Sequence, residues 1–281
     1  MIESIVIAGK NSIAIETYKY IRQKFPSIAL FGVCNSTDDG NNSFQPSFKK
    51  FLKTNGFSEI SLIESYTIKN AIFLSLEFDK IVKPENFESK GLYNIHFSLL
   101  PRYKGMYTSI WPILNGDRQT GVTLHRIDKG IDTGEIIAQA KFEIENNDTC
   151  GQLYGKYLIV GLNLVVGNLD ELIGNMVAST PQVKEGSTYY SKSSIDFTNI
   201  KIDLNNTAWT ISNQIRAFNF RAYQMPRVGG CAVSSCYITN EISDKKPGTL
   251  LSESDSEFAY ATVDYNIVIY KDNFESILNI C

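Results

Sequence analysis

The sequence predicts an α/β protein built on a mostly parallel sheet, followed by a small β-rich C-terminal part. In the first half of the chain, short runs of consecutive apolar residues alternate with segments whose apolar residues recur at helical spacing. Strands that are apolar throughout and separated by helices are typical of a parallel sheet covered on both faces. From about residue 186 the pattern loosens into short strands and turns, which indicates a separate β-rich part.

The elements of the first half follow in order. The apolar runs that we interpret as parallel strands are 4–9, 28–34, 71–76 and 92–97. A helix capped by Asn11 or Ser12 is expected to run to about Phe25. A polar loop rich in Asn, Asp and Gly covers 35–46, and a second helix is expected near 47–55.

The second half begins with an expected antiparallel pair of strands, 120–127 and 135–144. A long helix then starts at a cap provided by Asp148 or Thr149 and is expected to end at about Met176.

The domain boundary is placed where the pattern changes. A helix near 206–218 precedes the short strands that continue to the end of the chain. We therefore predict a main domain at 1–185, and a linker helix with a small β-rich domain at 186–281.

Composition and charge exclude several classes of protein. The 281-residue chain is 43% hydrophobic and 20% charged, as in a soluble globular protein, and no stretch approaches the roughly 20 apolar residues of a membrane span. The N-terminus has no basic region followed by a cleavage site, so we expect a cytoplasmic protein without membrane insertion. Five scattered cysteines favour reduced thiols and no metal site, and a formal charge of −3 argues against a nucleic-acid partner.

The most informative segment of the chain is 94–134. Asn94 and His96 alternate along a strand and therefore project from the same side at its carboxyl end, where open α/β sheets bind ligands. Further on, the turn RIDKGIDTG supplies Asp132, a carboxylate that can orient an imidazole and raise its basicity. An amide such as that of Asn94 can donate to an oxygen that becomes negative in a transition state. Taken alone, a histidine at a strand end is more often a structural hydrogen-bonding residue than a catalyst.

Two other features give weaker signals. The segment AGKNSIA follows a strand and opens a helix, where backbone N–H groups can hold an anion, but a tight turn is the better interpretation. His125 lies inside the predicted strand 120–127, and a packing or hydrogen-bonding role is a better interpretation than a second catalytic histidine.

Three motifs stand close together: NIHFSLLPRYKG (94–105), WPILNG (111–116) and TGVTLHRIDKGIDTG (120–134). Together they resemble the signature of the N10-formyltetrahydrofolate-dependent formyltransferases, a family that includes methionyl-tRNA, glycinamide ribonucleotide and nucleotide-sugar enzymes. The resemblance implies a Rossmann-like domain and direct attack of an amine on a formyl carbon. One departure is Phe97, where many members have proline, and we expect it to alter the strand end without touching the catalytic groups.

The resemblance also implies roles for individual residues. The family's catalytic set falls on Asn94, which stabilises the oxyanion, His96, which takes the proton, and Asp132, which orients and tunes His96. N10-formyltetrahydrofolate is the implied cofactor, with no metal, and the family holds its pterin by backbone groups after a strand and around the aspartate turn. The residues that we assign to this cofactor site are Leu76, Phe78, Ile81 and Asp128.

Three acceptors compete for the role of substrate. Methionyl-tRNA requires positive surface, but residues 231–281 carry three lysines, no arginine and eight acidic residues, and the loop 35–46 has two aspartates and no basic residue. Glycinamide ribonucleotide enzymes are typically a single shorter domain with a phosphate site in the first strand–helix turn, which AGKNSIA does not resemble.

The nucleotide-sugar enzymes fit best. The stretch 104–116 resembles the loop of enzymes that formylate dTDP-linked amino-dideoxy sugars, and 215–227 resembles their acceptor-pocket linker. The residues that we assign to the acceptor are Arg102, Gly105, Met106, Tyr107, Phe218 and Tyr223. Aromatic side chains here can stack on a base, and Arg216 or Arg221 can meet a pyrophosphate, although packing of Phe218 and Ile215 in a helix is an equal alternative.

The sequence therefore predicts an N-formyltransferase acting on the 3-amino or 4-amino group of a dTDP-linked amino-dideoxy sugar, such as dTDP-4-amino-4,6-dideoxyglucose. The product is expected to enter a bacterial surface polysaccharide such as O-antigen. Methionyl-tRNA is the alternative acceptor, and a homodimer is expected by analogy. A non-enzymatic protein that only binds folate or nucleotide sugar is expected to lack Asn94, His96 or Asp132, and all three are present.

Overall fold

The computed structural model describes residues 1–174 and 176–273. The chain divides into two compact units, each made of several segments. Unit 1 consists of Met1–Met106, Thr120–Phe142 and Gly155–Tyr190, and unit 2 of Tyr107–Gln119, Glu143–Tyr154 and Ser191–Cys281. The domain division at residues 185 and 186 stays a prediction.

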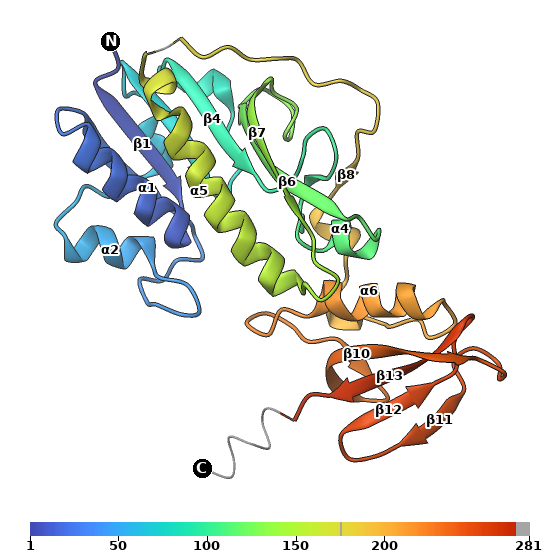
Figure 1. Cartoon of the computed structure of the whole chain (residues 1–281). Coiled ribbons are helices and arrows are strands. Elements are labelled where there is room, and N and C mark those ends of the chain that lie inside the picture. Colours follow the sequence, from blue (N-terminus) through green and yellow to red (C-terminus); the bar gives the residue numbers. More distant parts are fainter. Residues whose placement is uncertain (175, 274–281) are drawn as a thin grey trace. The chain divides into compact units, whose positions relative to one another are not determined.

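A six-stranded sheet forms the centre of unit 1, in the order β2-β1-β3-β4-β6-β7 (Figure 1). Its strands are β1 (Ser4–Gly9), β2 (Ala29–Cys34), β3 (Ala71–Leu76), β4 (Gly91–His96), β6 (Gln119–Arg126) and β7 (Ile136–Glu143). The pairs β1–β2, β1–β3 and β3–β4 are parallel, whereas β6 runs antiparallel to β4. The predicted α/β fold with a mostly parallel sheet is confirmed.

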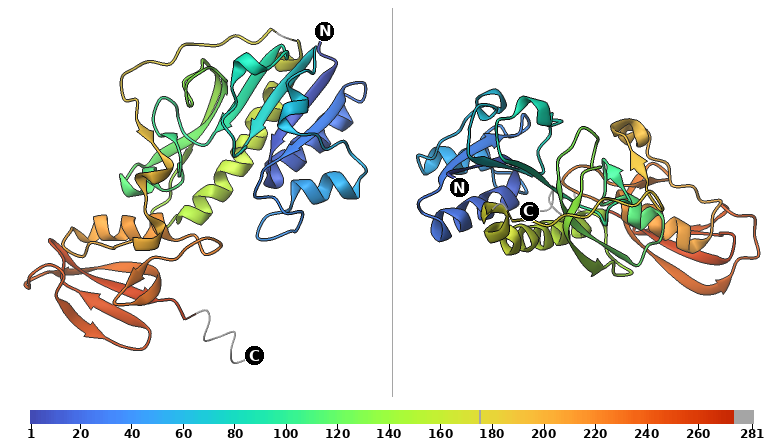
Figure 2. Two further views of the ribbon diagram at one scale, coloured as in Figure 1. Left: turned by 180° about the vertical axis from the view of Figure 1, so that it is seen from behind. Right: turned by 90° about the horizontal axis from the view of Figure 1, so that it is seen from above.

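Helices α1 (Asn11–Lys24) and α5 (Cys150–Gly174) cover one face of this sheet (Figures 1 and 2). A Cβ atom at Gly161 of α5 would come within 3.1 Å of the Ile13 side chain and 3.4 Å of Ile95, so the helix packs closely on both α1 and β4. The opposite face is covered by apolar residues that include Ile60, Leu62 and Ile68 after β2, and Phe78 and Phe87 after β3. The buried residues beneath that cover are Val6, Ala8, Val33 and Phe73 of the sheet, together with Val82.

Helix α5 differs from the expectation that no stretch is apolar enough to span a bilayer. By length and composition alone it passes that test, with a mean hydropathy of 1.3 over its most apolar 18 residues. Its buried apolar residues recur at helical spacing and include Leu153, Tyr157, Leu158, Val165, Leu169 and Leu172. One buried side is typical of a helix that packs on a protein core.

The two long helices begin differently from each other. Before α5, the Gln152 N–H donates to Thr149 Oγ1 (3.3 Å) and the Thr149 N–H donates to Gln152 Oε1 (2.9 Å), so the predicted Thr149 cap is confirmed. Before α1, the predicted cap is wrong, because Asn11 is already helical and lies in the left-handed region with φ 61°. Its Nδ2 donates to Glu77 Oε2 (3.0 Å), which ties the helix start to the end of β3.

The remaining elements of unit 1 are short. They are α2 (Phe48–Thr54), α3 (Leu62–Ser65), the 3₁₀ helix η1 (Pro84–Asn86), β5 (Lys104–Gly105) and β8 (Tyr189–Tyr190). The two-residue strands β5 and β8 pair in parallel, which holds the chain after β4 against residues 189–190.

Unit 2 contains a five-stranded sheet in the order β11-β12-β13-β10-β9, as the predicted β-rich part requires. Its elements are α4 (Trp111–Leu114), η2 (Lys192–Ser194), η3 (Phe197–Asn199), α6 (Ala208–Phe218), β9 (Arg227–Val228), β10 (Cys231–Ile242), β11 (Leu250–Glu253), β12 (Glu257–Tyr260) and β13 (Tyr265–Lys271). Helix α6 packs Ile211 and Ile215 against Val233, Ile267 and Ile269 of the sheet. Among the described residues, the four cysteines are free thiols.

The buried hydroxyl of Tyr157, in the core of unit 1, leads to a prediction about stability. Tyr157 is fully buried, its ring stacks on Phe97 (centroids 5.2 Å apart), and its hydroxyl bonds Thr120 Oγ1 at 2.7 Å. Tyr157→Phe keeps the ring but leaves a buried hydroxyl without this partner, so we expect a loss of about 1–3 kcal/mol in the free energy of unfolding, measured by urea denaturation. Tyr189→Phe, at a side chain that is 54% exposed, is the matched control and should change stability by less than about 0.5 kcal/mol. Equal effects of the two changes would contradict the prediction.

Candidate active site

At the carboxyl end of β4, successive side chains point to opposite faces of the sheet. Ile95 and Phe97 point toward α5, where both lie close to Gly161. Because neighbouring side chains on a strand alternate, Asn94 and His96 project from the opposite face. The two side chains therefore lie on one side of the strand, as predicted. Phe97 packs on the other side, away from them.

Asp132 reaches the same place from the turn that links β6 to β7. A Cβ atom at Gly134 would lie 1.8 Å from the Arg126 carbonyl oxygen, so only glycine allows the turn to close this tightly. Asp132 itself takes a left-handed conformation with φ 54°, which aspartate tolerates better than most residues. The Gly105 N–H, from β5, donates to Asp132 Oδ2 at 2.8 Å and fixes the carboxylate.

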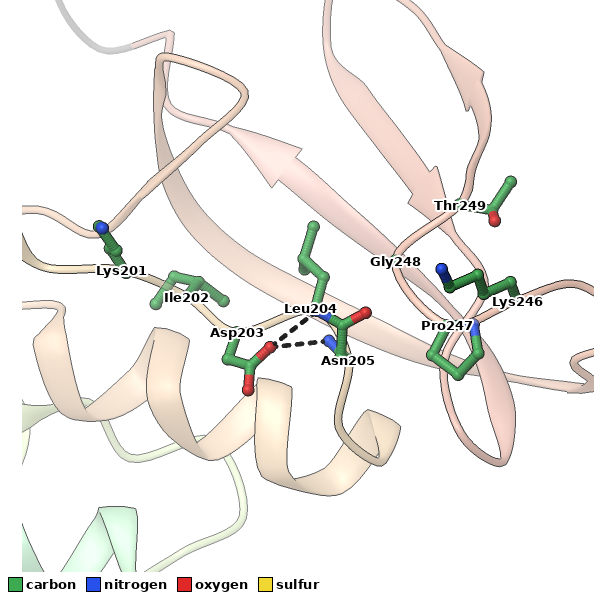
Figure 3. Close-up of a pocket in the computed structure, with 9 residues that line it drawn as sticks. All are labelled: Lys201, Ile202, Asp203, Leu204, Asn205, Lys246, Pro247, Gly248 and Thr249. Carbon is green, nitrogen blue, oxygen red and sulfur yellow. Dashed lines mark hydrogen bonds between the residues drawn. The ribbon is translucent and has the colours of Figure 1, made fainter.

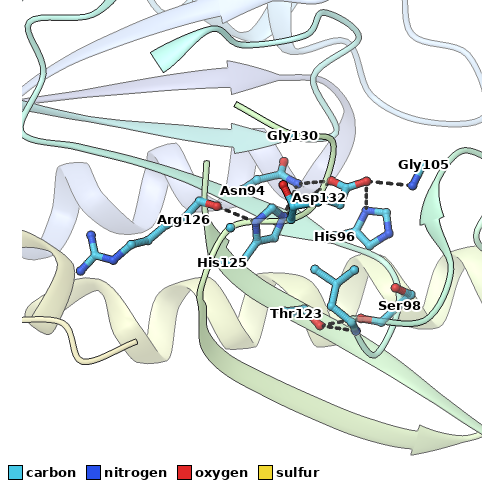
Figure 4. Close-up of polar contacts among 12 residues, drawn as sticks. Asn94, His96, Ser98, Gly105, Thr123, His125, Arg126, Gly130 and Asp132 are labelled. Carbon is cyan, nitrogen blue, oxygen red and sulfur yellow. Dashed lines mark hydrogen bonds and ion pairs between the residues drawn. The ribbon is translucent and has the colours of Figure 1, made fainter. Parts of the chain in front are cut away.

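The structure brings the three predicted catalytic residues together (Figure 4). Asp132 Oδ2 lies 3.5 Å from His96 Nδ1, and Asp132 Oδ1 lies 3.5 Å from Asn94 Nδ2. The Asp132 side chain is only 13% exposed and that of His96 only 8%. An amide, an imidazole and a carboxylate thus converge in a largely buried position at the carboxyl edge of the sheet, where hydrogen bonds and charges act strongly.

The tautomer of His96 is set by a group that the sequence did not indicate. His96 Nε2 lies 2.8 Å from the carbonyl oxygen of Tyr103, which can only accept, so Nε2 carries a hydrogen. In the neutral ring the lone pair is therefore on Nδ1, facing Asp132. Asp132 is expected to orient this ring, but the Tyr103 carbonyl is the closer partner, and the carboxylate faces the nitrogen that carries the lone pair.

His125 is the residue of this cluster that the sequence reasoning did not assign to the site. It is the direct partner of Asn94 in the antiparallel β4–β6 pair, and its Nε2 lies 3.0 Å from Asn94 Nδ2 and 3.7 Å from Asp132 Oδ1. Its Nδ1 faces the Arg126 carbonyl oxygen at 2.8 Å. The expected hydrogen-bonding role is thus played inside the cluster. Only the register of β4 on β6 could have indicated it, and the sequence pattern does not fix that register.

The electrostatics of the cluster centre on Asp132. Burial alone would raise the pKa of this carboxyl, but His96, His125 and the Gly105 N–H outweigh it and hold the pKa of Asp132 well below its ordinary value. The group is therefore a fixed anion at neutral pH. Within residues 1–174 and 176–273, no three His, Cys, Asp or Glu side chains are grouped so that they could hold a metal ion.

Ser98, the next polar residue of the strand end, has a structural role. Its hydroxyl donates to the Arg102 carbonyl (2.6 Å), and its own carbonyl accepts from Thr123 Oγ1 (2.7 Å). Thr123 Oγ1 in turn accepts from the Leu100 N–H and from Gln139 Nε2. This network holds the loop that carries the Tyr103 carbonyl and Gly105 against the sheet.

The four residues assigned to the cofactor lie in unit 1 in different environments. Leu76 is buried at the end of β3, and Phe78 packs edge-on against Phe73. Ile81 is 71% exposed. Asp128 shapes the aspartate turn, since its Oδ1 accepts from the Gly130 N–H and the Thr133 hydroxyl. Their contact with a folate stays a prediction.

The acceptor residues fall in both units. In unit 1, Arg102 donates to the Tyr103 hydroxyl, Gly105 holds Asp132, and Met106 is 44% exposed.

In unit 2, Tyr107 takes a left-handed conformation (φ 61°) and its ring meets Phe197 edge-on at 4.8 Å. Phe218 is half-buried at the end of α6, and Tyr223 is 58% exposed beside Phe220. Ile215 is fully buried, so packing is the outcome for that residue.

The two arginines suggested for a pyrophosphate are engaged within unit 2. Arg216 is buried and donates to the carbonyls of Glu145 and Asp148 and to Asn213 Oδ1. Arg221 forms a two-pronged ion pair with Asp272, both N–O distances being 2.8 Å. Arg216 therefore does not fit the suggested role, because its guanidinium already holds the protein interior together.

A separate hollow of about 600 Å³ lies in unit 2, between residues 201–205 and 246–249 (Figure 3). Asp203, which lines it, accepts from the backbone and side-chain amides of Asn205. None of the residues assigned to the site from the sequence lines this hollow. We therefore place the candidate active site at Asn94, His96 and Asp132.

Comparison with known proteins identifies the family. Residues 63–167 match the formyl transferase domain family. Methionyl-tRNA formyltransferase from Kosmotoga olearia is 30% identical over 236 residues, a match that covers 82% of this chain and 73% of that protein.

Two solved structures resemble the chain over almost its whole length. WlaRD, a sugar 3N-formyl transferase determined in the presence of dTDP and 5-N-formyl-THF, is 39% identical with a TM-score of 0.90, covering 97% of this chain and 99% of that one. The N-formyltransferase from Helicobacter canadensis, in complex with folinic acid and dTDP-3-aminofucose, is 39% identical with a TM-score of 0.89, covering 97% of this chain and 100% of that one. The chain therefore belongs to the formyltransferase family and is a folate-dependent N-formyltransferase.

Proposed function

We propose that this enzyme transfers a formyl group from N10-formyltetrahydrofolate to the 3-amino group of a dTDP-linked amino-dideoxy sugar. The observation that carries the proposal is the 39% identity, over 97% of the chain, to two enzymes solved with a formyl-folate and with dTDP or a dTDP-3-amino sugar. The likeness extends through unit 2, which is where an acceptor-specific part of the chain is expected. A role in O-antigen synthesis, a cytoplasmic location and a homodimer remain part of this proposal.

The residues present fit a bound formyl donor. Formyl transfer to an amine needs a group that takes a proton and a donor for the carbonyl oxygen, and the cluster holds an imidazole and an amide beside a fixed carboxylate. When bound, N10-formyltetrahydrofolate supplies the electrophilic formyl carbon. The residues of this chain that would hold it are those at the end of β3 and in the aspartate turn, from Leu76 to Ile81 and from Asp128 to Asp132.

Each residue of the cluster has a task in this reaction. His96, with Nε2–H on the Tyr103 carbonyl, takes the proton of the attacking amine at Nδ1. Asp132, facing Nδ1 at 3.5 Å, stabilises the imidazolium that results. Asn94 presents its amide N–H to the oxygen that becomes negative. Such a donor typically lowers the activation barrier by about 3–4 kcal/mol.

Methionyl-tRNA is the second candidate acceptor, favoured by the 30% identity to the Kosmotoga olearia enzyme. Charge argues against it. The tail at 231–281 has three lysines against eight acidic residues, and the loop 35–46 contains two aspartates and no base. Asp38 of that loop accepts from the Gly40 N–H and from the Ser47 hydroxyl, so the loop folds around this acidic side chain. Such a surface repels phosphates.

The acceptor prediction is tested directly. Purified protein is incubated with N10-formyltetrahydrofolate and, in parallel, with dTDP-3-amino sugars, dTDP-4-amino sugars and methionyl-tRNA, and formylated product is measured by mass spectrometry. We expect a 3-amino sugar to give the highest kcat/KM. His96→Asn protein serves as the blank. Formylation of the tRNA and of no sugar would overturn the proposed function.

The role of His96 gives a second prediction. His96→Asn keeps a polar side chain but cannot take a proton near neutral pH, so kcat should fall by about 10²–10⁴-fold. Binding of dTDP, measured by calorimetry, should be unchanged, because the base does not hold the nucleotide. Substantial turnover by the variant would show that His96 is not the base.

The pKa of Asp132 gives a third prediction, about stability. Because this pKa is depressed in the folded protein, the carboxylate stabilises the fold above the pKa of about 3.9 that aspartate has when unfolded, and this stabilisation is lost as pH falls below that value. Asp132→Asn should cost about 1–3 kcal/mol at pH 5, and the difference from wild type should shrink toward pH 2. Urea denaturation at several pH values measures it.

Asp244→Asn is the matched control, since that side chain is 79% exposed and its substitution should shift stability by less than about 0.5 kcal/mol. A wild-type advantage over Asp132→Asn that grows on acidification would contradict the prediction.

A further inference from the structure

The protonation of one ring nitrogen of His125, Nδ1, is fixed by its partner, whereas the other nitrogen, Nε2, can gain or lose a proton. The ring is 2% exposed, and its Nδ1 lies 2.8 Å from the Arg126 carbonyl oxygen. A carbonyl only accepts, so Nδ1 carries a hydrogen whenever this bond is made. The protonation state of the ring is then decided at Nε2, which faces Asn94 Nδ2 at 3.0 Å and Asp132 Oδ1 at 3.7 Å.

With a neutral His125 ring, Nε2 has a lone pair and can only accept. The Asn94 amide must then turn its NH₂ group inward, as in the structure, with one hydrogen toward His125 and the other toward Asp132 Oδ1 at 3.5 Å (Figure 4). Both amide hydrogens are used in this arrangement. Asn94 then has none left to donate to an oxyanion.

With a protonated ring, the pairing reverses. Nε2–H donates, so Asn94 must turn its oxygen toward His125, and its NH₂ group faces the other way. The two ends of an amide are nearly equal in size, so this turn needs no repacking. It exchanges the 3.5 Å hydrogen bond to Asp132 Oδ1 for a hydrogen bond from the charged His125 ring.

The charged and titratable groups near His125 are Asp132, His96 and Arg126. The Asp132 carboxylate faces Nε2, and the His96 ring lies 6.4 Å away between centroids. The Arg126 guanidinium is engaged with Ser179 Oγ and the Val177 carbonyl.

We propose that His125 is a positioning residue for Asn94, and that protonation of His125 Nε2 turns the Asn94 NH₂ group toward the formyl oxygen. This deepens the proposed function and rests on it, since the formyl oxygen is the partner that the turned amide meets. The enzyme is then active when His125 is protonated while His96 is neutral. The proposal therefore predicts that activity falls at high pH, where the Asn94 amide turns back.

The orientation of the amide is measured without any substrate. The chain has two histidines, so in isotope-labelled protein the His125 ring and the Asn94 side-chain NH₂ group can both be followed by NMR between about pH 5 and 9, with Asn94→Ser used to assign the amide. We expect the Asn94 resonances to move with the midpoint of His125, and not to move in His125→Gln. The proposal would be overturned if the His125 ring did not change its charge in this pH range, or if the Asn94 resonances did not move as the ring does so. This readout stands even if the acceptor is not the proposed sugar.

Kinetics of two matched variants test the consequence for turnover. His125→Leu removes the partner of Asn94, so kcat should fall by about 10²–10³-fold with little change in KM. Gln has a permanent N–H donor, so His125→Gln should retain more turnover than His125→Leu and lose the fall in kcat at high pH. Wild-type kcat in His125→Leu, or an unchanged high-pH limb in His125→Gln, would overturn the proposal. Absence of transfer by the wild type to every acceptor would instead overturn the proposed function.

Discussion

A single buried carboxylate, that of Asp132, is the group on which the arrangement of this site depends. Two imidazoles face it, and a backbone carbonyl fixes the far nitrogen of each, Tyr103 for His96 and Arg126 for His125. Each ring is therefore oriented by the backbone and responds to the carboxylate only through its free nitrogen. The two imidazoles and the Gly105 N–H in turn outweigh burial and hold the pKa of Asp132 well below its ordinary value, so the carboxylate is an anion at neutral pH.

The fold delivers these groups from segments that are distant in sequence. Strand β4 carries Asn94 and His96 on the face opposite α5, and the antiparallel strand β6 places His125 directly beside Asn94. The turn after β6 then returns Asp132 to the same edge, which requires glycine where the turn passes the Arg126 carbonyl. The mixed character of the sheet is thus part of the site, because a parallel neighbour would not return the chain to this edge within a short turn.

Much of this could be predicted from the sequence, and the failures have physical causes. Strands such as β1 and β3 are apolar except for one serine each, so their bounds follow from composition, and Thr149 with Gln152 is a local capping pattern. The Asn11 cap was wrong because its amide bonds Glu77, a tertiary contact. The Tyr103 carbonyl could not be assigned from sequence, since no side-chain type marks a backbone acceptor.

In the proposed reaction, charge balance offers a reason for a second histidine beside Asp132. Before the reaction, one imidazolium is enough to balance the charge of Asp132. Both rings lie close to that carboxylate, His96 Nδ1 at 3.5 Å and His125 Nε2 at 3.7 Å. When the formyl oxygen becomes negative, the buried site holds two negative groups, and His96 gains its proton at that stage. Under the proposal that His125 is protonated, two imidazolium rings then face two anions, and the charges in the low-dielectric site balance. A site with His96 alone would hold an uncompensated negative charge at that point, which burial makes costly.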